Sequence, residues 1–329
     1  MAERSDEPDA REVAAFLLDL HRRSHELGYR AMQRFAFERF RSLVPLDGGL
    51  FAVGTLQGSA PQAHDVYLFD KPPELMESWE TVKHEDRLAF AAAASPNTTI
   101  AISASGPLYD QLDRARAHCA RFDIEHLMCT AHVYAEAGLY WVMSVYRSAA
   151  RPPFSEAERV TNELLSPHLF AASRNARIGE LRTLTRMGGG HGQLAGIVSA
   201  AGLVLEAEPG LANILRAEWP WWSGPFLPDA LGEVLPKGAG LVKGERIVVR
   251  VDPADEARLV HARMRVPADE LTERERQIAE AFSLGESHRE IGDRLQISPA
   301  TVRRHLANLY EKLGVSSKAE LDRMLRASD

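Results

Sequence analysis

The stretch ISPATVRRHLANLYEKLG, residues 297–314, decides how the C-terminal part of the chain folds. Ser298 followed by Pro299 predicts a helix start, because a serine hydroxyl caps the first amides and proline fits the first helical position. Gly314 predicts the end of this helix, since glycine readily takes the left-handed cap conformation. Four apolar residues between these signals have the spacing of one helix face, and they are Val302, Leu306, Leu309 and Leu313.

Three more helix starts surround this helix. Each pairs a hydroxyl residue with a glutamate three positions later, which is the pattern of a capping box. The pairs are Thr272 with Glu275, Ser287 with Glu290, and Ser317 with Glu320. We therefore predict four short helices, at residues 273–284, 288–295, 299–313 and 318–326. The second and third helices are joined only by Gln296-Ile297-Ser298, which is typical of a helix-turn-helix.

The third helix presents two adjacent arginines, Arg303 and Arg304, away from its apolar face. In a helix-turn-helix, residues at such positions reach base edges in the major groove, where arginine can bond bidentately to guanine. Residues 298–318 hold four Lys or Arg and one Glu, although the whole chain carries a net charge of -7. The predicted DNA-binding residues are Ser298, Thr301, Arg303, Arg304, His305, Ala307, Asn308, Lys312 and Lys318.

These residues have different expected roles on the DNA. Asparagine pairs with adenine, so Asn308 is a second candidate for base contact. The helix amides near Ser298 and Thr301 can hold a phosphate. Lys312 and Lys318 are expected to contact the phosphate backbone, which positions the protein without specifying sequence.

Residues 271–321 resemble the LuxR-type helix-turn-helix domain of bacterial transcription regulators. The matching elements are LTERE, EIG, ISPATV and YEKLGV. The resemblance implies a sequence-specific transcription regulator in which Arg303, Arg304 and Ala307 face bases, although alanine can touch only a thymine methyl. Gly292 stands where the family commonly has alanine, which we expect to loosen helix two. His288 stands where the family commonly has lysine, which we expect to remove one phosphate contact.

The resemblance also implies partners. The last helix often dimerises in this family, and its apolar stripe here consists of Leu321, Met324 and Leu325. A symmetric dimer would bind two half-sites about one DNA turn apart on double-stranded DNA. Contact with RNA polymerase is a further expectation.

The first 265 residues predict antiparallel strands flanked by helices, an α+β pattern. Residues 72–94 are predicted to be helical, 229–235 to form a short helix, and AEAG at 135–138 to form a hairpin turn. Residues 30–178 resemble a GAF domain in FRSLVP, DGGLFAVG and FSEAERVTNELLSPHL, and residues 195–265 resemble a degenerate PAS domain in IVSAAGLVLEAEPGLANIL. The expected fold is therefore multi-domain, with GAF-like and PAS-like α+β parts before an all-α helix-turn-helix domain.

Glycines mark the main boundary between these parts. MGGGHG, residues 187–192, is a flexible joint, and the absence of a following Lys-Ser/Thr argues against a phosphate-binding loop. We expect a GAF-like sensory domain with N-terminal helices at 1–186, a linker at 187–192, a PAS-like domain at 193–265 and the DNA-binding domain at 266–329.

Composition favours a cytoplasmic protein. The two cysteines are too few for a disulfide framework. The N-terminal MAERSDEPDAREV lacks the apolar region of a signal peptide, and no apolar run approaches the roughly 18 residues of a membrane span. No nucleophile elbow, paired-acid site or metal-protease motif indicates an enzyme. We predict no bound cofactor, while a small-molecule or protein signal is expected to act on the N-terminal domains.

Two alternatives remain open. Cys119, His126, Cys129 and His132 have side chains that suit a metal or a redox switch. On a strand, His126 and His132 share one face and Cys129 points to the other, which favours ordinary strand residues. The second alternative is a protein-interaction module whose helix-turn-helix does not bind DNA.

Overall fold

The computed structural model describes residues 9–57, 60–134, 139–188, 192–254 and 257–328. The predicted AEAG turn at 135–138 lies outside these residues, as do residues 189–191 of the glycine-rich joint. The chain forms two compact units. The first contains Met1–Thr183, Ala201–Glu206 and Gly224–Leu227, and the second contains Leu184–Ala200, Ala207–Ser223 and Pro228–Asp329. The division into four parts expected from the sequence stays a prediction.

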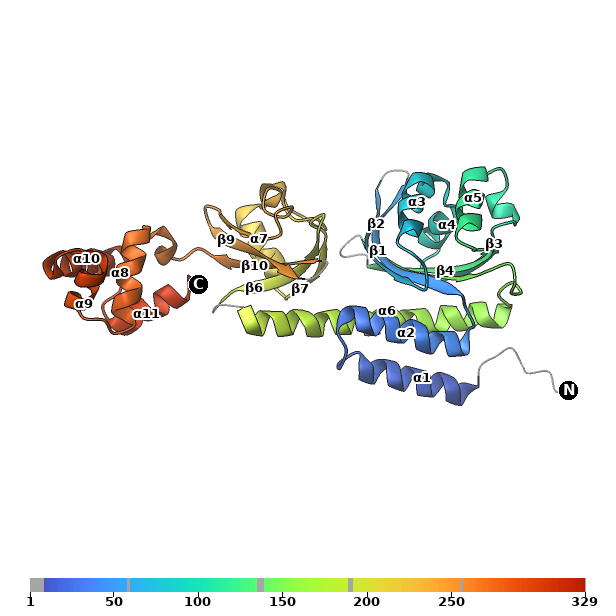
Figure 1. The fold of residues 1–329 in the computed structure, drawn as a ribbon, viewed down its shortest axis with the longest axis horizontal. Coiled ribbons are helices and arrows are strands. Elements are labelled where there is room, and N and C mark those ends of the chain that lie inside the picture. The colour runs from blue at the N-terminus through green and yellow to red at the C-terminus, as the bar shows by residue number, and fades with distance from the viewer. Residues whose placement is uncertain (1–8, 58–59, 135–138, 189–191, 255–256, 329) are drawn as a thin grey trace. The chain divides into compact units, whose positions relative to one another are not determined.

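The first sheet has five antiparallel strands in the order β2-β1-β5-β4-β3 (Figure 1). Within it, β4 pairs with β5, as the AEAG turn signal predicts, and β1 pairs with both β2 and β5. The short strand β3 pairs with β4 at the edge of the sheet. The strands are β1 (Gly48–Gln57), β2 (Ala60–Phe69), β3 (Thr99–Ser103), β4 (His126–Tyr134) and β5 (Leu139–Arg147).

Helices cover both faces of this sheet. Figure 1 shows α3 (Glu74–Val82), α4 (Arg87–Ala94) and α5 (Asp113–Arg121) over one face. Three further helices lie on the other side: α2 (Tyr29–Leu43), the long α6 (Glu156–Gly188), and α1 (Ala10–Arg23), which packs on α2. Phe170 of α6 packs against Phe51 and Trp141 of the sheet.

The predicted helical segment at 72–94 is present but divided into α3 and α4. A short 3-10 turn at Lys83–Glu85 ends the first helix, and a new helix begins after Asp86. The Asp86 carboxylate accepts a hydrogen bond of 3.0 Å from the Ala89 amide, so it caps α4. On the other side of the sheet, α6 continues to Gly188, past the predicted start of the linker at residue 187, and the linker itself stays a prediction.

A buried charge cluster ties α2 and α6 to the first sheet. The Asp65 carboxylate accepts from Tyr29 Oη at 2.9 Å and from Arg30 at 2.6 Å, and it pairs with Arg177 of α6. The Arg177 side chain is only 2% exposed and its guanidinium carbon lies 3.5 Å from the Tyr29 ring centroid. Burial raises the pKa of Asp65, but Arg177 and Arg30 outweigh burial and hold it below its ordinary value.

The second sheet is also antiparallel, in the order β7-β6-β10-β9-β8. Its strands are β6 (Leu194–Ser199), β7 (Val204–Ala207), β8 (Gly240–Lys243), β9 (Ile247–Ala254) and β10 (Ala257–Met264), and α7 (Leu211–Glu218) packs on β6, β9 and β10. The sequence analysis missed β8. The predicted helix at 229–235 is only a 3-10 turn at Asp229–Leu231.

The C-terminal part is all α-helical, as predicted. A 3-10 turn at Pro267–Glu270 leads into α8 (Glu273–Ser283), α9 (His288–Leu295), α10 (Pro299–Leu313) and α11 (Lys318–Arg326). The multi-domain fold class, with α+β parts followed by a helix-turn-helix domain, is therefore confirmed. Among the described residues, none of the helices combines the length and apolar character that crossing a membrane requires.

Candidate functional site

The turn between α9 and α10 is built from the predicted local signals. The Ser298 hydroxyl accepts from the Thr301 amide at 3.1 Å, and Pro299 occupies the first helical position. Gln296 takes a left-handed conformation with φ 56°, which lets the Ile297 amide reach the Gly292 carbonyl at 2.9 Å.

Gly292 has a packing role in this turn. A Cβ atom there would lie 2.6 Å from the Ile297 carbonyl oxygen, closer than side chains approach backbone oxygens. The glycine therefore allows the turn to close against α9. The sequence indicated only a weakened helix at this position.

One face of α10 forms the core of the domain. Val302, Leu306, Leu309 and Leu313 are all buried, as predicted, and they pack with Ile291 of α9 and Ile278 of α8. The capping boxes of α8 and α9 are present as predicted. The third differs in part: Ser317 caps α11, but Glu320 accepts from the Ser316 amide at 2.6 Å.

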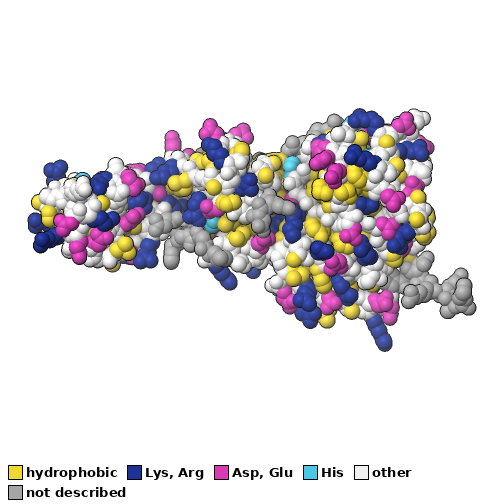
Figure 2. All heavy atoms as spheres, viewed as in Figure 1, with side chains coloured by type: hydrophobic (Ala, Val, Ile, Leu, Met, Phe, Trp, Pro, Cys, Tyr) yellow, Lys and Arg dark blue, Asp and Glu magenta, His cyan; other side chains and the backbone are white. Residues whose placement is uncertain are grey.

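The opposite face of α10 presents Arg303, Arg304, Ala307 and Asn308 to solvent. Figure 2 shows Lys and Arg side chains gathered over α9 and α10. Within the described residues, neither Arg303 nor Arg304 has a hydrogen bond or an ion pair to another side chain. Two exposed guanidinium groups without partners on one capped helix are free to bind an external acceptor.

The remaining predicted contacts differ in availability. Thr301 and His305 are half-buried on the flank of α10. Lys312 Nζ donates to Glu275 Oε2 at 2.8 Å and to the Glu270 carbonyl at 3.0 Å, so it already has partners inside the domain. This lysine hydrogen bond is the main cause of the lowered pKa of Glu275. Lys318 is exposed, with Nζ 5.5 Å from the Phe282 ring centroid.

Arg289 was not among the predicted DNA contacts. It lies exposed in the first turn of α9, two residues after the Ser287 cap, and the described residues offer it no hydrogen bond or ion pair. The first helix of a helix-turn-helix crosses the DNA backbone, so a cation at its start is placed for a phosphate. Its position in the first turn after the predicted capping serine Ser287 was the available signal. His288, by contrast, stacks on Phe282 with ring centroids 5.7 Å apart.

The predicted dimer residues lie mostly inside the domain. Leu321 and Leu325 are buried in its core, where they cannot meet a second copy directly. Met324 is half-buried and is the one of the three with exposed area. The apolar stripe on α11 therefore reflects core packing for two of its three members.

A second feature is a cavity of about 130 Å³ between the first sheet and helices α3–α5. Its wall is mostly apolar, with polar groups from Trp79, Asp86 and Tyr109. Asp86 accepts from Trp79 Nε1 at 2.8 Å and from Tyr109 Oη at 3.1 Å. We call it the sensor cavity.

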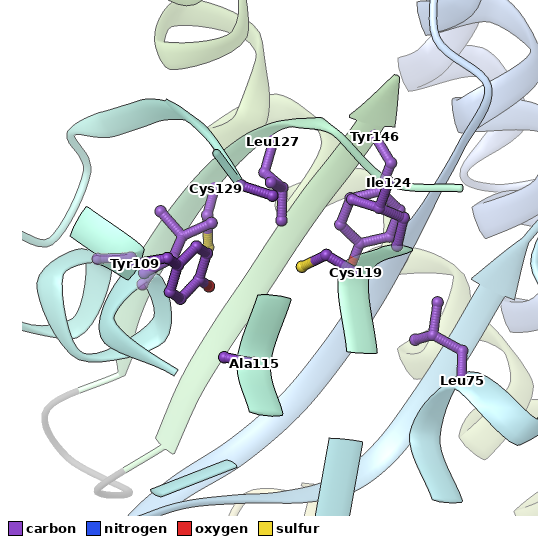
Figure 3. Close-up of a cluster of buried hydrophobic side chains, with 12 residues drawn as sticks. Leu75, Tyr109, Ala115, Cys119, Ile124, Leu127, Cys129 and Tyr146 are labelled. Carbon is purple, nitrogen blue, oxygen red and sulfur yellow. The ribbon is translucent and has the colours of Figure 1, made fainter. Parts of the chain in front are cut away.

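Both cysteines line the sensor cavity. Figure 3 shows Cys119 and Cys129 directed into the same buried cluster as Tyr109 and Tyr146. Burial raises the pKa of each thiol to about 12, so both are neutral thiols near pH 7. Since the thiolate is the reactive and metal-binding form, neither group is prepared for redox or metal chemistry.

The two histidines of the same proposed cluster have other partners. His126 Nδ1 is hydrogen-bonded to Ser103 at 2.8 Å, and His132 is hydrogen-bonded to Asn97. The part of the chain that the structure describes contains no group of three or more His, Cys, Asp or Glu placed to hold a metal ion. Among the described residues, the structure therefore offers no geometric support for the metal-responsive alternative.

Comparison with known proteins identifies the helical domain. Residues 269–325 match the family model of bacterial regulatory proteins, luxR family. The transcriptional regulatory protein UhpA of Escherichia coli (strain K12) is 53% identical over 57 residues, which is 17% of this chain and 29% of UhpA. The probable transcriptional regulatory protein NarL of Mycobacterium tuberculosis is 32% identical over 118 residues, covering 36% of this chain and 55% of NarL. The match therefore spans less than two thirds of these relatives.

Solved structures show weaker likenesses. SdiA of Escherichia coli is 12% identical, with a TM-score of 0.39, and the match covers 96% of this chain and 97% of SdiA. The N-acylhomoserine-lactone-dependent factor CepR2 of Burkholderia cenocepacia is 14% identical, with a TM-score of 0.40, covering 52% of this chain and 98% of CepR2. A GAF domain from Pseudomonas syringae pv. tomato is 17% identical, with a TM-score of 0.34, covering 54% of this chain and 94% of that domain. TM-scores below 0.5 carry no argument about ligand or function.

Proposed function

Because residues 269–325 match the LuxR-family regulators, we propose that the chain is a sequence-specific DNA-binding transcription regulator. The observation that carries this proposal is the exposed pair Arg303 and Arg304, without partners among the described residues, on the capped second helix of a helix-turn-helix. The matched relatives are transcriptional regulators, which supports a role other than enzyme catalysis.

In the proposed complex, α10 enters the major groove with its N-terminal half leading. Arg303 and Arg304 bond to guanine edges, and Ala307 contacts a thymine methyl. Asn308 is placed one residue further along the same face and supplies an adenine contact.

Phosphates are held by a second set of groups. The α10 amides near Ser298 and Thr301 accept one phosphate between them, because a helix N-terminus favours an anion. His305, Lys318 and Arg289 hold others. Lys312 joins them only by leaving Glu275 and Glu270.

The proposed partners are double-stranded DNA, a second copy of the chain and RNA polymerase, in the cytoplasm. A symmetric dimer would bind half-sites separated by one helical turn, about 34–36 Å. Since Leu321 and Leu325 are core residues, its contacts on α11 must come from Met324 and exposed neighbours.

The sensor cavity is the proposed place of control. Its apolar wall and the Asp86–Trp79–Tyr109 hydrogen bonds suit a small, mostly apolar effector with one polar group. Such a ligand would act by binding the DNA-competent state of the protein more or less tightly than the other state.

The test uses the full-length protein and a library of genomic fragments at several salt concentrations. Selective recovery of a few fragments that share a symmetric motif, with binding that falls as salt rises, is the expected result. Uniform recovery, or none, calls for the same selection with residues 266–329. If that fragment is helical by circular dichroism and also recovers no motif, the alternative of a helix-turn-helix that serves only protein interaction replaces the proposal.

A further inference from the structure

One face of the second sheet carries a row made of two arginines and a buried histidine. Side chains alternate along a strand, so Arg250, His261 and Arg263 lie on the face opposite Val249 and Val251. Arg250 stands directly opposite His261 in the register of β9 and β10. The cationic residues of two strands are therefore neighbours rather than scattered charges.

The third cation comes from the sheet edge. Val248 stands opposite Arg263 on β10 and opposite Lys243 on β8, so Lys243 and Arg263 flank the same apolar residue. Lys243 is exposed and, within the described residues, makes no hydrogen bond or ion pair.

A cavity of about 180 Å³ opens over this row. The helical domain closes it with Arg276 of α8, Asp269 and Ser328. Among the described residues of the wall, Asp269 is the one carboxylate, and both its oxygens accept from Arg263 at 2.7 Å. The remaining charges of the wall, on Lys243, Arg250 and Arg276, are positive, although Asp252 accepts from Arg250 at 2.9 Å beside the cavity. We call this space the junction cavity.

Two polar groups in the wall lack partners. His261 is 2% exposed and its buried Nε2 has no hydrogen bond among the described residues; the nearest carboxylate oxygen, on Asp252, lies 3.7 Å away. The side-chain oxygen of Gln193 is also buried and has no hydrogen-bond partner in the part of the chain that the structure describes. Leaving a buried polar group unpaired costs free energy, so a ligand that pairs with both groups gains that energy on binding.

The chemistry of the missing partners follows from these groups. In its Nε2–H tautomer, neutral His261 donates, and the surrounding cations require a negatively charged acceptor. The Gln193 oxygen requires a donor such as a hydroxyl group. The volume slightly exceeds the roughly 150 Å³ of a cavity that holds benzene, so the ligand is small.

We propose that the junction cavity binds a small oxyanion that also carries a hydroxyl group, either a phosphate monoester or a hydroxycarboxylate. Arg250 and Lys243 hold the oxyanion, His261 donates to it, and Gln193 accepts from the hydroxyl. The site contains none of the predicted DNA-binding residues, so it does not depend on the proposed function.

Calorimetry on the full-length protein tests the site with inorganic phosphate, glycerol phosphate and malate, all at one ionic strength set with chloride. The variants are Lys243→Gln and Arg250→Gln. Lys237→Gln is the matched control, because Lys237 is exposed on the same unit and lies outside the cavity wall. We expect saturable binding that weakens about tenfold or more in each cavity variant and is unchanged in the control.

A second readout follows the His261 ring resonances by NMR, assigned with a His261→Asn variant. Whichever of glycerol phosphate and malate binds more tightly in calorimetry identifies the class of oxyanion. That compound should also shift the His261 resonances of the wild-type protein. Absence of binding by all three probes above the chloride background overturns the proposal. Equal binding by wild type and both cavity variants overturns it as well, since exposed Lys243 can be replaced without loss of the fold.

Discussion

Replacement of Arg303 and Arg304 by alanine should abolish selective DNA binding while leaving the domain folded. Both side chains are exposed and have no partner among the described residues, so the stability change should stay within about 0.5 kcal/mol. Each bidentate contact with guanine is worth roughly 1–3 kcal/mol. Loss of both contacts in one half-site therefore weakens binding by about 2–6 kcal/mol, which is roughly 30-fold at least.

The assay is fluorescence anisotropy with the operator recovered from the fragment library and with a scrambled duplex of equal length. The double variant should lose most of its preference for the operator. Arg22→Ala with Arg34→Ala makes the same change of charge at exposed positions of the first unit, where the side chains are 61% and 71% exposed. This control should keep full selectivity, because screening restricts the relevant field to the DNA-binding surface.

Unchanged selectivity in the Arg303→Ala, Arg304→Ala variant would refute the assignment of the reading face. Equal loss of affinity for operator and scrambled DNA would show that the two arginines contact phosphates rather than bases. Loss of the helical circular dichroism signal would instead show that they support the fold.

Three further predictions follow from other sites. Arg289→Ala should weaken binding to operator and scrambled DNA alike and reduce the salt-dependence slope by about 1, measured by anisotropy from 50 to 200 mM salt. Asp65→Asn should lower the free energy of unfolding in urea by about 3–5 kcal/mol, because it leaves the buried Arg177 without its counter-charge. Cys119 and Cys129 should react with a disulfide reagent at pH 8 only after unfolding, since burial raises both thiol pKa values to about 12.

The charge cluster also predicts the pH dependence of stability. The folded-state pKa of Asp65 is depressed below its ordinary value, so its contribution is fully present above about pH 4 and is lost as pH falls through the folded pKa. Urea unfolding between pH 3 and 7 should therefore show a loss in the wild type that Asp65→Asn lacks. If the stability of wild type and of Asp65→Asn depended on pH in the same way, the ion pair would be contradicted.

If Arg289→Ala left the salt dependence of DNA binding unchanged, Arg289 would not be a phosphate contact. Rapid modification of both thiols in the folded protein would contradict their burial.

Local signals predicted the helix-turn-helix well. Ser298, Pro299 and Gly314 act on their own neighbours in the chain, so the sequence contains all the information that sets these helix ends. The break at Asp86 was missed because its carboxylate is fixed by Trp79 and Tyr109, and the second of these comes from a distant segment.

Contacts between distant segments also explain the other differences. A stripe of apolar residues on α11 has the same spacing whether it faces a core or a second copy, so Leu321 and Leu325 could not be assigned from sequence. The short strand β8 has only four residues, and its pairing with β9 rather than its composition defines it. The junction cavity requires residues from the sheet and from the helical domain together, which no local pattern shows.

The pair of Arg263 and Asp269 has a mechanical consequence. It joins the end of β10 to the 3-10 turn at the start of the helical domain, and the two side chains are only 6% and 2% exposed. Arg263 also donates to the Ser328 carbonyl, which follows α11. Separation of the pair would strand a buried charge at a cost of about 3–5 kcal/mol. The second sheet and the helical domain should accordingly unfold in a single calorimetric transition. A displacement of β10 would also displace the helical domain, because the buried pair connects them directly.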